Sequence, residues 1–422
     1  MTATLRARAR ALFAIGLAAA DPARAVRASL AKHPVPATRI IAVGKAALPM
    51  LRAAREFVPE ASAIAVTNRG NVGGAASEHV LVAGHPVPDA GGEAAARAVE
   101  AFARDASEGE TVLVLVSGGG SAMLPAPIEG ITLVDKIAVT ELLLSSGAPI
   151  DAINTVRRAL SRLKGGGLAR LIHPARTVAL LLSDVPRDEI AAIASGPTVP
   201  VREKLDAALA VLRRFDVLDR VPGAVRAVLE RSAMERPVRA PLIEPNVENR
   251  LVGGNGVSVR AMVDGGAEAF GNAPHAIVNI SDWLDGDVAD AAARLHRAAR
   301  EAPPGDVALV TGGETTVVLR GSGRGGRNQE LALRFAMLCE ETPLGRPWAF
   351  LSGGTDGRDG PTDAAGGLVD HETVPRLRAV GVDVEAALAR NDSGTVLERA
   401  NALLVTGGTG TNVADLQVVV LG

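Results

Sequence analysis

The sequence contains few residues of several types, and each scarcity excludes a class of protein. A single cysteine, Cys339, among 422 residues excludes an intrachain disulfide and a cysteine-ligated metal cluster. Tyrosine is absent and aromatic residues make up 2% of the chain, so we expect no platform for stacking nucleic-acid bases. The net charge of −2 gives no electrostatic attraction for nucleic acid. No run reaches the roughly 18 to 20 apolar residues of a membrane span, so we expect no membrane partner either.

The basic N-terminus allows two interpretations. Arg6, Arg8 and Arg10 precede an alanine-rich stretch at residues 11–20, which resembles the core of a signal peptide. The alternative is a first helix that packs an apolar face, and Asp21-Pro22 is more typical of a helix end than of a cleavage site. We expect the helix, and a cytoplasmic protein.

What the sequence does contain is a regular alternation of strand-like and helix-like segments. The runs at residues 111–116 and 177–182 are almost entirely apolar, as in strands that are buried on both faces. The alternation predicts an α/β fold, with largely parallel or mixed sheets flanked by helices and a Rossmann-like N-terminal domain. The expected strands are residues 38–43, 61–67, 79–83, 111–116, 177–182, 275–280, 307–311, 315–319, 348–352, 402–405 and 416–421. The expected helices are residues 44–57, 92–106, 133–145, 150–163, 257–270, 287–300 and 330–339.

The length of the chain predicts two domains. Pro237, Pro241 and Pro245 lie close together, and this composition shift places the boundary near residue 240. We therefore expect domains at residues 1–240 and 241–422. The last strand belongs to the second domain or returns to the first.

The most informative motif lies at residues 312–330. The expected strand at 315–319 leads into a loop, residues 321–326, that holds four glycines, and a helix follows. Glycines let backbone N–H groups approach a bound anion, and a helix N-terminus adds partial positive charge. Arg324 and Arg327 add planar donors that suit phosphate. The GxGxxG spacing also matches a dinucleotide fingerprint, but the next expected strand ends in Leu351-Ser352 instead of the acidic residue that the fingerprint requires. We interpret the loop as a phosphate site.

Several expected strands end in loops that favour ligand binding, because ligands bind beyond the carboxyl ends of parallel strands. Lys45 follows the first strand, in a chain with five lysines and forty arginines. A lysine at a helix start is disfavoured by the helix dipole, which favours a functional role over a merely exposed side chain. We expect Lys45 to neutralise phosphate charge.

Two further loops are candidates for substrate binding. Residues 117–121, with the sequence Ser-Gly-Gly-Gly-Ser, offer backbone N–H groups and two hydroxyls, although they lack the Lys-Ser/Thr ending of a P-loop. A flexible turn is the alternative interpretation. His85 lies in a loop stiffened by Pro86 and Pro88, where it is positioned either for a substrate oxygen or for structural hydrogen bonds.

Aspartates provide the candidate metal ligands. Asp184 directly follows a buried strand, which is typical of a Mg²⁺-associated carboxylate or a general base, and an N-cap or turn role is the alternative. Asp356, Asp359 and Asp363 are spaced three and four residues apart in a glycine-rich loop, where turn formation is again the alternative. From these residues we expect Asp184, Asp356 and Asp363 as metal ligands.

Taken together, these motifs resemble the class II glycerate 2-kinase family, whose C-terminal half is called the MOFRL domain. The matching segments run in the family's order from about residue 40 to residue 412. They are Val43-Gly-Lys-Ala46, Gly84-His-Pro-Val-Pro-Asp89, Leu115-Val-Ser-Gly-Gly-Gly-Ser121, Asn154-Thr-Val-Arg157, Lys164-Gly-Gly166, Leu182-Ser-Asp-Val185, Ala194-Ser-Gly-Pro197, Gly312-Gly-Glu-Thr315, Gly325-Gly-Arg-Asn-Gln-Glu330, Gly354-Thr-Asp-Gly357, Gly360-Pro-Thr-Asp-Ala-Ala-Gly-Gly367 and Thr406-Gly-Gly-Thr-Gly-Thr-Asn412.

The resemblance implies phosphorylation of D-glycerate at its 2-hydroxyl by ATP, with Mg²⁺, in a monomer or homodimer. It also implies two α/β domains with the active-site cleft between them. It further implies a catalytic lysine and arginine, which correspond to Lys45 and Arg327, and we add Asp184 as a catalytic residue. The expected substrate-binding residues are His85, Ser117, Gly118, Gly119, Gly120, Ser121 and Arg157. The expected ATP- or phosphate-binding residues are Gly313, Glu314, Gly323, Arg324, Gly325, Gly326, Asn328, Gly354 and Thr355. Two alternatives are an NAD(P)-dependent hydroxypyruvate reductase and a regulator that binds sugar phosphates.

Overall fold

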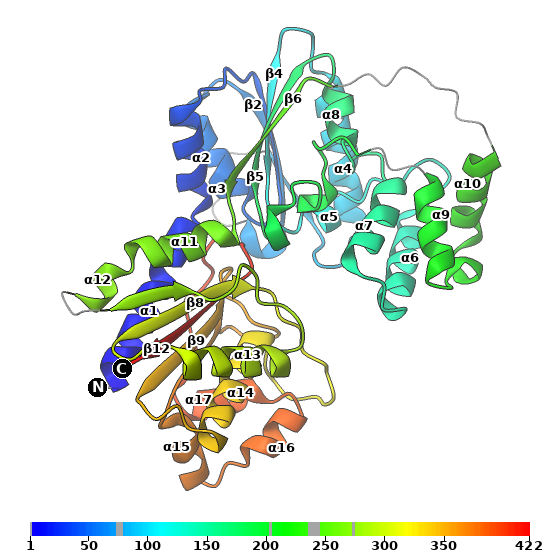
Figure 1. Cartoon of the computed structure of the whole chain (residues 1–422). Coiled ribbons are helices and arrows are strands. Elements are labelled where there is room, and N and C mark those ends of the chain that lie inside the picture. Colours follow the sequence, from blue (N-terminus) through cyan, green and yellow to red (C-terminus); the bar gives the residue numbers. More distant parts are fainter. Residues whose placement is uncertain (1, 73–78, 202–204, 235–244, 272–274) are drawn as a thin grey trace. The chain divides into compact units, whose positions relative to one another are not determined.

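The chain forms two compact units in the computed structural model, which describes residues 2–72, 79–201, 205–234, 245–271 and 275–422 (Figure 1). The N-terminal unit comprises Pro22–Ser183 and Glu189–Val252. The C-terminal unit comprises Gly253–Gly422 together with Asp184–Asp188 and the first 21 residues. A single boundary near residue 240 therefore does not describe this division, because two N-terminal segments belong to the C-terminal unit. Pro237 and Pro241 lie outside the described residues.

The N-terminal unit is built on a six-stranded sheet with the order β3-β2-β1-β4-β5-β6. Its strands are β1 (Arg39–Val43), β2 (Ser62–Asn68), β3 (Val80–Ala83), β4 (Thr111–Val116), β5 (Arg176–Leu182) and β6 (Val247–Gly253). The pairs β1–β2, β1–β4, β2–β3 and β4–β5 are all parallel. In the register of β1 and β4, Val43 lies across from Val116, so the segments that begin at Gly44 and Ser117 leave the sheet next to each other.

Helices cover this sheet and also form a separate bundle (Figure 1). The helices associated with the sheet are α2 (Pro22–Lys32), α3 (Ala47–Arg55), α4 (Ala90–Arg104), α5 (Gly120–Met123) and α8 (Gly167–Ile172). The bundle consists of α6 (Leu133–Ser145), α7 (Ile150–Ala159), α9 (Leu205–Arg214) and α10 (Gly223–Met234). Its apolar core includes the fully buried Leu143, Leu212 and Leu229.

The C-terminal unit is built on a mixed six-stranded sheet with the order β11-β10-β9-β12-β8-β7. Its strands are β7 (Ala276–Asn279), β8 (Val307–Gly313), β9 (Trp348–Gly354), β10 (Gly366–Asp370), β11 (Leu403–Leu404) and β12 (Asp415–Leu421). The last strand, β12, runs antiparallel to both β8 and β9 in the middle of this sheet. It does not return to the N-terminal unit, which the sequence analysis had left open.

Two groups of helices cover the two faces of the C-terminal sheet. One face packs against α1 (Thr2–Ala19), α11 (Asn255–Gly265) and α12 (Ala267–Phe270). The other face packs against α13 (Val288–Glu301), α14 (Arg327–Glu341), α15 (Thr373–Ala379), α16 (Val384–Ala389) and α17 (Ser393–Arg399). Cys339 is buried in the core under α14, as expected of a cysteine with an apolar role.

The predicted N-terminal helix is confirmed as α1. Its residues Leu5, Leu12 and Phe13 share one face and are buried against the sheet. Arg6 donates to Asp370 at 2.6 Å and Arg8 donates to Asp306 at 2.8 Å, so these two arginines also contribute to the fold. Among the described residues, no helix is both long enough and apolar enough to cross a bilayer.

Several predicted elements differ from the structure. The strand expected at residues 315–319 is wrong: only an isolated bridge joins Thr316 to Asp287, and Leu319 is 77% exposed. β-branched residues favour strands only where a neighbouring strand and a packing surface are present, and this segment has already left β8. The helix expected at residues 257–270 is interrupted between α11 and α12, at Gly266. Strands β6 and β10 were missed, and β6 was missed because it begins just after the proline-rich region that was interpreted as the domain boundary.

Candidate functional site

In the C-terminal unit, three sequence motifs meet at one edge of the sheet. Asp415, the first residue of β12, lies across from Gly313 at the end of β8 and from Gly354 at the end of β9. A side chain at Gly313 would place its Cβ 2.0 Å from the carbonyl oxygen of Leu284, so only glycine fits there. The antiparallel register of β12 therefore brings one carboxylate between two motifs that are far apart in the sequence.

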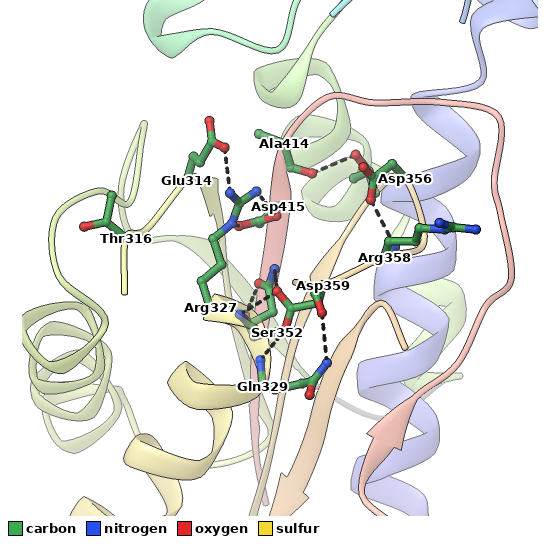
Figure 2. A network of polar contacts seen from close by, with 12 residues as sticks. Glu314, Thr316, Arg327, Gln329, Ser352, Asp356, Arg358, Asp359, Ala414 and Asp415 are labelled. Carbon is green, nitrogen blue, oxygen red and sulfur yellow. Dashed lines mark hydrogen bonds and ion pairs between the residues drawn. The ribbon is translucent and has the colours of Figure 1, made fainter. Parts of the chain in front are cut away.

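Arg327, the first residue of α14, is fixed at this edge by two carboxylates (Figure 2). Its Nε and Nη2 donate to the two oxygens of Asp415 at 2.7 and 3.0 Å, and its Nη1 donates to Glu314 at 2.7 Å. The Asp415 side chain is 1% exposed, whereas Glu314 is 47% exposed. Burial opposes the charge of Arg327, but the ion pairs with Asp415 and Glu314 outweigh burial and raise the pKa of the guanidinium. Arg327 is therefore a rigid, permanently charged group that remains partly open to solvent.

The N-terminus of α14 is capped by a carboxylate from another loop, that of Asp359 (Figure 2). The Asp359 oxygens accept hydrogen bonds from the backbone N–H groups of Asn328 at 3.1 Å and Gln329 at 2.8 Å. Asp359 is 3% exposed, and burial raises its pKa to about 7 even though these two amides favour the charged form. The helix amides that the sequence analysis considered for phosphate are thus engaged by the protein's own carboxyl group.

The glycine-rich loop at residues 321–326 packs closely against the segment that follows α16. Gly323 N–H donates to the Arg390 carbonyl at 2.9 Å, and Gly394 N–H donates to the Arg324 carbonyl at 2.8 Å. A Cβ at Gly323 would lie 2.5 Å from the Arg390 carbonyl oxygen, and one at Gly325 would lie 2.3 Å from the Ser393 hydroxyl. The glycines at these positions allow two stretches of protein backbone to approach each other.

Other predicted phosphate-binding residues also make contacts within the protein. Gly326 lies beside Asp359, and a Cβ there would lie 2.3 Å from an Asp359 carboxylate oxygen. Thr355 Oγ1 donates to the Ala414 carbonyl at 2.7 Å, and Asn328 Oδ1 accepts from Ser352 at 2.6 Å. Arg324 differs, because its side chain is 54% exposed and its ion pair with Glu398 is long, at 3.7 Å. Arg324 and Arg327 are thus two cations near this edge of the sheet that are at least partly exposed.

The three aspartates expected as metal ligands lie in different surroundings in the structure. Asp184 accepts from Asn412 at 3.4 Å, Asp356 accepts from the backbone N–H of Arg358 at 3.0 Å, and Asp363 is exposed. Within the described ranges, no three His, Cys, Asp or Glu side chains are grouped so that they could hold a metal ion. Asp356 thus stabilises a turn and Asp184 contacts the 406–412 motif, and a role for these aspartates as metal ligands stays a prediction.

In the N-terminal unit, the segments after β1 and β4 are joined by hydrogen bonds. Lys45 N–H donates to the Gly118 carbonyl at 2.9 Å, and Ala46 N–H donates to the Ser117 hydroxyl at 3.0 Å. Gly44 has a φ of +120°, and a Cβ there would lie 2.3 Å from the same hydroxyl. The half-buried Lys45 thus lies beside the triple-glycine segment, as the parallel register of the two strands requires.

A pocket of about 430 Å³ in the N-terminal unit collects four of the predicted substrate-binding residues, namely His85, Gly119, Ser121 and Arg157. The His85 ring packs over Gly119, where a Cβ would lie 3.0 Å from the ring, and Gly119 has a φ of +85°. Gly120 begins α5 beside the pocket. Ser121 shares a hydrogen bond of 2.8 Å with the Ser195 hydroxyl.

Sequence reasoning missed the roles of four charged residues in these two places. In the C-terminal unit, Asp415 was not singled out, and Asp359 was considered without its capping role. In the N-terminal unit, Lys136 was not singled out, and Lys164 was named only within a matching motif, although both line the pocket. Two signals were available. Lysine is rare in this chain, and Asp415 is an acidic residue at the start of an otherwise apolar strand.

Comparison with known proteins gives a consistent result along the chain. A family model described as a domain of unknown function, DUF4147, matches residues 8–230, and the model of the MOFRL family matches residues 307–415. The chain is 40% identical to D-glycerate 2-kinase of Thermotoga maritima, over 94% of this chain and 93% of that protein. It is 38% identical to glycerate 2-kinase of Pyrococcus horikoshii, over 90% of this chain and 87% of that protein.

Solved structures agree with these relatives. The crystal structure of glycerate kinase from Thermotoga maritima matches with a TM-score of 0.86 at 37% identity, over 99% of both chains. A second crystal structure, of a Pyrococcus horikoshii protein, matches with a TM-score of 0.77 at 36% identity, over 98% of this chain and 97% of that one.

Proposed function

Because the chain belongs to the glycerate 2-kinase family, we propose that it transfers the terminal phosphoryl group of ATP to the 2-hydroxyl of D-glycerate. The products would be 2-phosphoglycerate and ADP. The similarity to two named glycerate 2-kinases over about nine-tenths of this chain is the observation that carries the proposal. None of the relatives described above is named as a reductase, so we prefer phosphoryl transfer to hydride transfer.

In the proposed reaction, the 2-hydroxyl oxygen bonds to the γ-phosphorus while the bond to the β–γ bridging oxygen breaks. Such a reaction depends chiefly on positioning and on neutralising the charge of the transferred group. Arg327 is proposed to stabilise this group, supported by its fixed orientation on Asp415 and its partial exposure. Lys45 is proposed as the second cation, supported by its position at the end of β1.

Asp184 is proposed to accept the proton of the attacking hydroxyl. Its support is its half-buried position directly after β5 and its contact with Asn412. The resemblance also implies Mg²⁺, but the described residues do not group into a site that fits this ion. We therefore assign no residue and no step to the metal.

The product formed from D-glycerate and ATP tests the proposal, and ³¹P NMR can identify it. We expect the signal of 2-phosphoglycerate together with ADP. A 3-phosphoglycerate signal would overturn the position of transfer but keep the kinase, and ligand binding without ADP release would favour the regulator instead. Oxidation of NADH with hydroxypyruvate, followed at the nicotinamide absorbance band, would favour the reductase.

A further inference from the structure

Two lysines support the floor of the N-terminal pocket from beneath. Lys164 Nζ donates to the carbonyls of Ser121 at 2.7 Å and Leu124 at 2.9 Å, and Lys136 Nζ donates to the carbonyl of Pro125 at 2.6 Å. Lys164 is 4% exposed and Lys136 is 8% exposed. Two lysines, one from α6 and one from the segment that follows α7, are thus buried around the short segment that contains α5.

The pocket has an excess of positive charge. Arg157, in the last turn of α7, lines it together with the two lysines. In the part of the chain that the structure describes, no carboxylate forms an ion pair with any of these three cations. Arg162 nearby shows the contrast, because it pairs with the buried Glu100 at 2.7 and 3.1 Å. Glu141 lies at the pocket's lining but is exposed.

Burial of these cations disfavours their charge. Burial, together with the charge of Arg157, lowers the pKa of Lys164 to about 7. Burial and the charges of Lys164, Arg157 and Arg162 hold the pKa of Lys136 well below its ordinary value, and burial also lowers the pKa of Arg157. A buried cation is stabilised when an anion is placed beside it, so this cluster favours a negatively charged ligand.

We propose that this pocket binds the carboxylate of a small hydroxy acid. Arg157 would contact the carboxylate, because its planar donors match the two oxygens. Lys136 and Lys164 are positioning residues that hold the 121–125 backbone, and their protonated forms add positive charge to the pocket. The pocket's remaining wall includes Pro86, Val87 and Ile137. These apolar side chains suit a ligand with one charge better than a polyphosphate. The assignment of D-glycerate as this acid rests on the proposed function.

Equilibrium binding of D-glycerate without nucleotide, measured by calorimetry, tests the proposal. R157Q should weaken binding roughly 10- to 100-fold, because charge-assisted hydrogen bonds to the carboxylate are lost. The matched control is R158Q, a change of the neighbouring arginine on α7, which does not line the pocket and should leave binding within about twofold of wild type. ATP affinity should be unchanged in both variants. Wild-type glycerate affinity in R157Q, or a loss of ATP affinity as large as the loss for glycerate, would overturn the proposal.

Proton uptake provides a second readout that a purely structural role would not change. Above pH 7, Lys164 is increasingly neutral in the free protein. A bound carboxylate favours the charged form of this lysine, so the protein should take up protons when it binds glycerate. The affinity for glycerate should therefore fall as the pH rises from 7 to 9. Calorimetry in buffers of different ionisation enthalpy measures this uptake. Lys136, Arg157, His85 and Glu141 also face the pocket. H85N should keep the uptake, and K164M should abolish it.

The outcomes separate this inference from the proposed function. Wild-type protein that binds glycerate without proton uptake would refute the role of Lys164, whether or not K164M folds. Glycerate binding that depends on Arg157, in a protein that forms no phosphoglycerate, would refute the kinase and leave the carboxylate site standing. If R157Q forms 2-phosphoglycerate with an unchanged KM for glycerate, the kinase function stands and the carboxylate site at Arg157 is refuted.

Discussion

Arg327 and its partner Asp415 show what can and cannot be found one residue at a time. The resemblance pointed to Arg327, but Asp415 lies 88 residues further along the chain and is brought beside it only by the register of β12. The glycines of residues 321–326 are a second case. Their spacing predicted an open cradle for an anion, whereas Gly323 and Gly325 accommodate the 390–394 segment. Glycine permits close approach of a ligand and of protein backbone equally, so composition alone does not distinguish the two.

Substitution of Arg327 should reduce turnover more than substrate binding. R327A should lower kcat roughly 10³-fold, by analogy with arginines that stabilise a transferring phosphoryl group. R327K keeps the charge but loses the two-pronged geometry, so we expect an intermediate rate. The measurement is steady-state kinetics with D-glycerate and ATP, after circular dichroism has verified that each variant is folded.

The matched control for this experiment lies on the same helix. Arg334 lies about two turns further along α14 than Arg327 and pairs with Glu330. R334Q should therefore keep near wild-type turnover. Folded R327A with a kcat close to that of the wild type would show that Arg327 has no catalytic role.

At the scale of elements, the alternation of buried strands and helices was predictable and the exceptions have local causes. Strands β4 and β5 were found because, after their first one or two residues, they are entirely apolar. Strand β10 begins with Gly366-Gly367, where a Cβ would collide with Ser352 or Ala332, so its sequence resembles a turn. The start of α14 also could not be predicted in full, because its cap, Asp359, comes from a loop some thirty residues away.

Asp359 should give the C-terminal unit a pH-dependent stability. The pKa of Asp359 is raised to about 7 in the folded state, whereas that of an unfolded aspartate is about 4. Between these two pH values, the Asp359 carboxyl group is protonated in the folded state and ionised in the unfolded state. The free energy of unfolding should therefore fall across this window relative to D359N, by at most about 1.4 kcal/mol per pH unit.

Urea denaturation at pH 4.5 and 7.5 measures this difference. D356N is the control, because Asp356 lies in the same loop but is half-buried instead of buried, and it accepts from the backbone N–H of Arg358. We expect D356N to follow the wild type. The assigned pKa would be contradicted if the free energy of unfolding changed by the same amount between the two pH values in D359N and in the wild type.

At the scale of the whole molecule, the presence of two domains could be predicted from chain length, but which segments of the chain form each domain could not. The sequence analysis placed all residues before 240 in one domain, whereas α1 packs on the C-terminal sheet. The amphipathic face of α1 shows that the helix must cover something, and no local pattern identifies its partner.

Phe13 tests the attachment of α1. It is 3% exposed and packs against Gly353, where a Cβ would lie 3.0 Å from the ring. F13A should lower the free energy of unfolding of the C-terminal unit by about 3–5 kcal/mol, because it leaves a cavity in the core. The two tryptophans of the chain, Trp283 and Trp348, both belong to this unit, so tryptophan fluorescence reports its denaturation.

Phe57 supplies the matched control, because it lies in the N-terminal unit and is 41% exposed. F57A should leave the fluorescence transition within about 0.5 kcal/mol of wild type. An F13A transition that coincides with that of F57A would show that α1 does not stabilise the C-terminal sheet.

The hydrogen bond from Thr411 to the carbonyl of Ala20 joins residues 391 positions apart. During translation, α1 therefore leaves the ribosome long before β12, the central strand on which it packs, has been made. At a translation rate of about 5–20 residues per second, roughly 20 seconds or more pass between the synthesis of α1 and that of β12. The apolar face of α1 is without this packing partner during that time. The N-terminal sheet can form in that interval, whereas the C-terminal sheet has to assemble last, around a helix that was synthesised first.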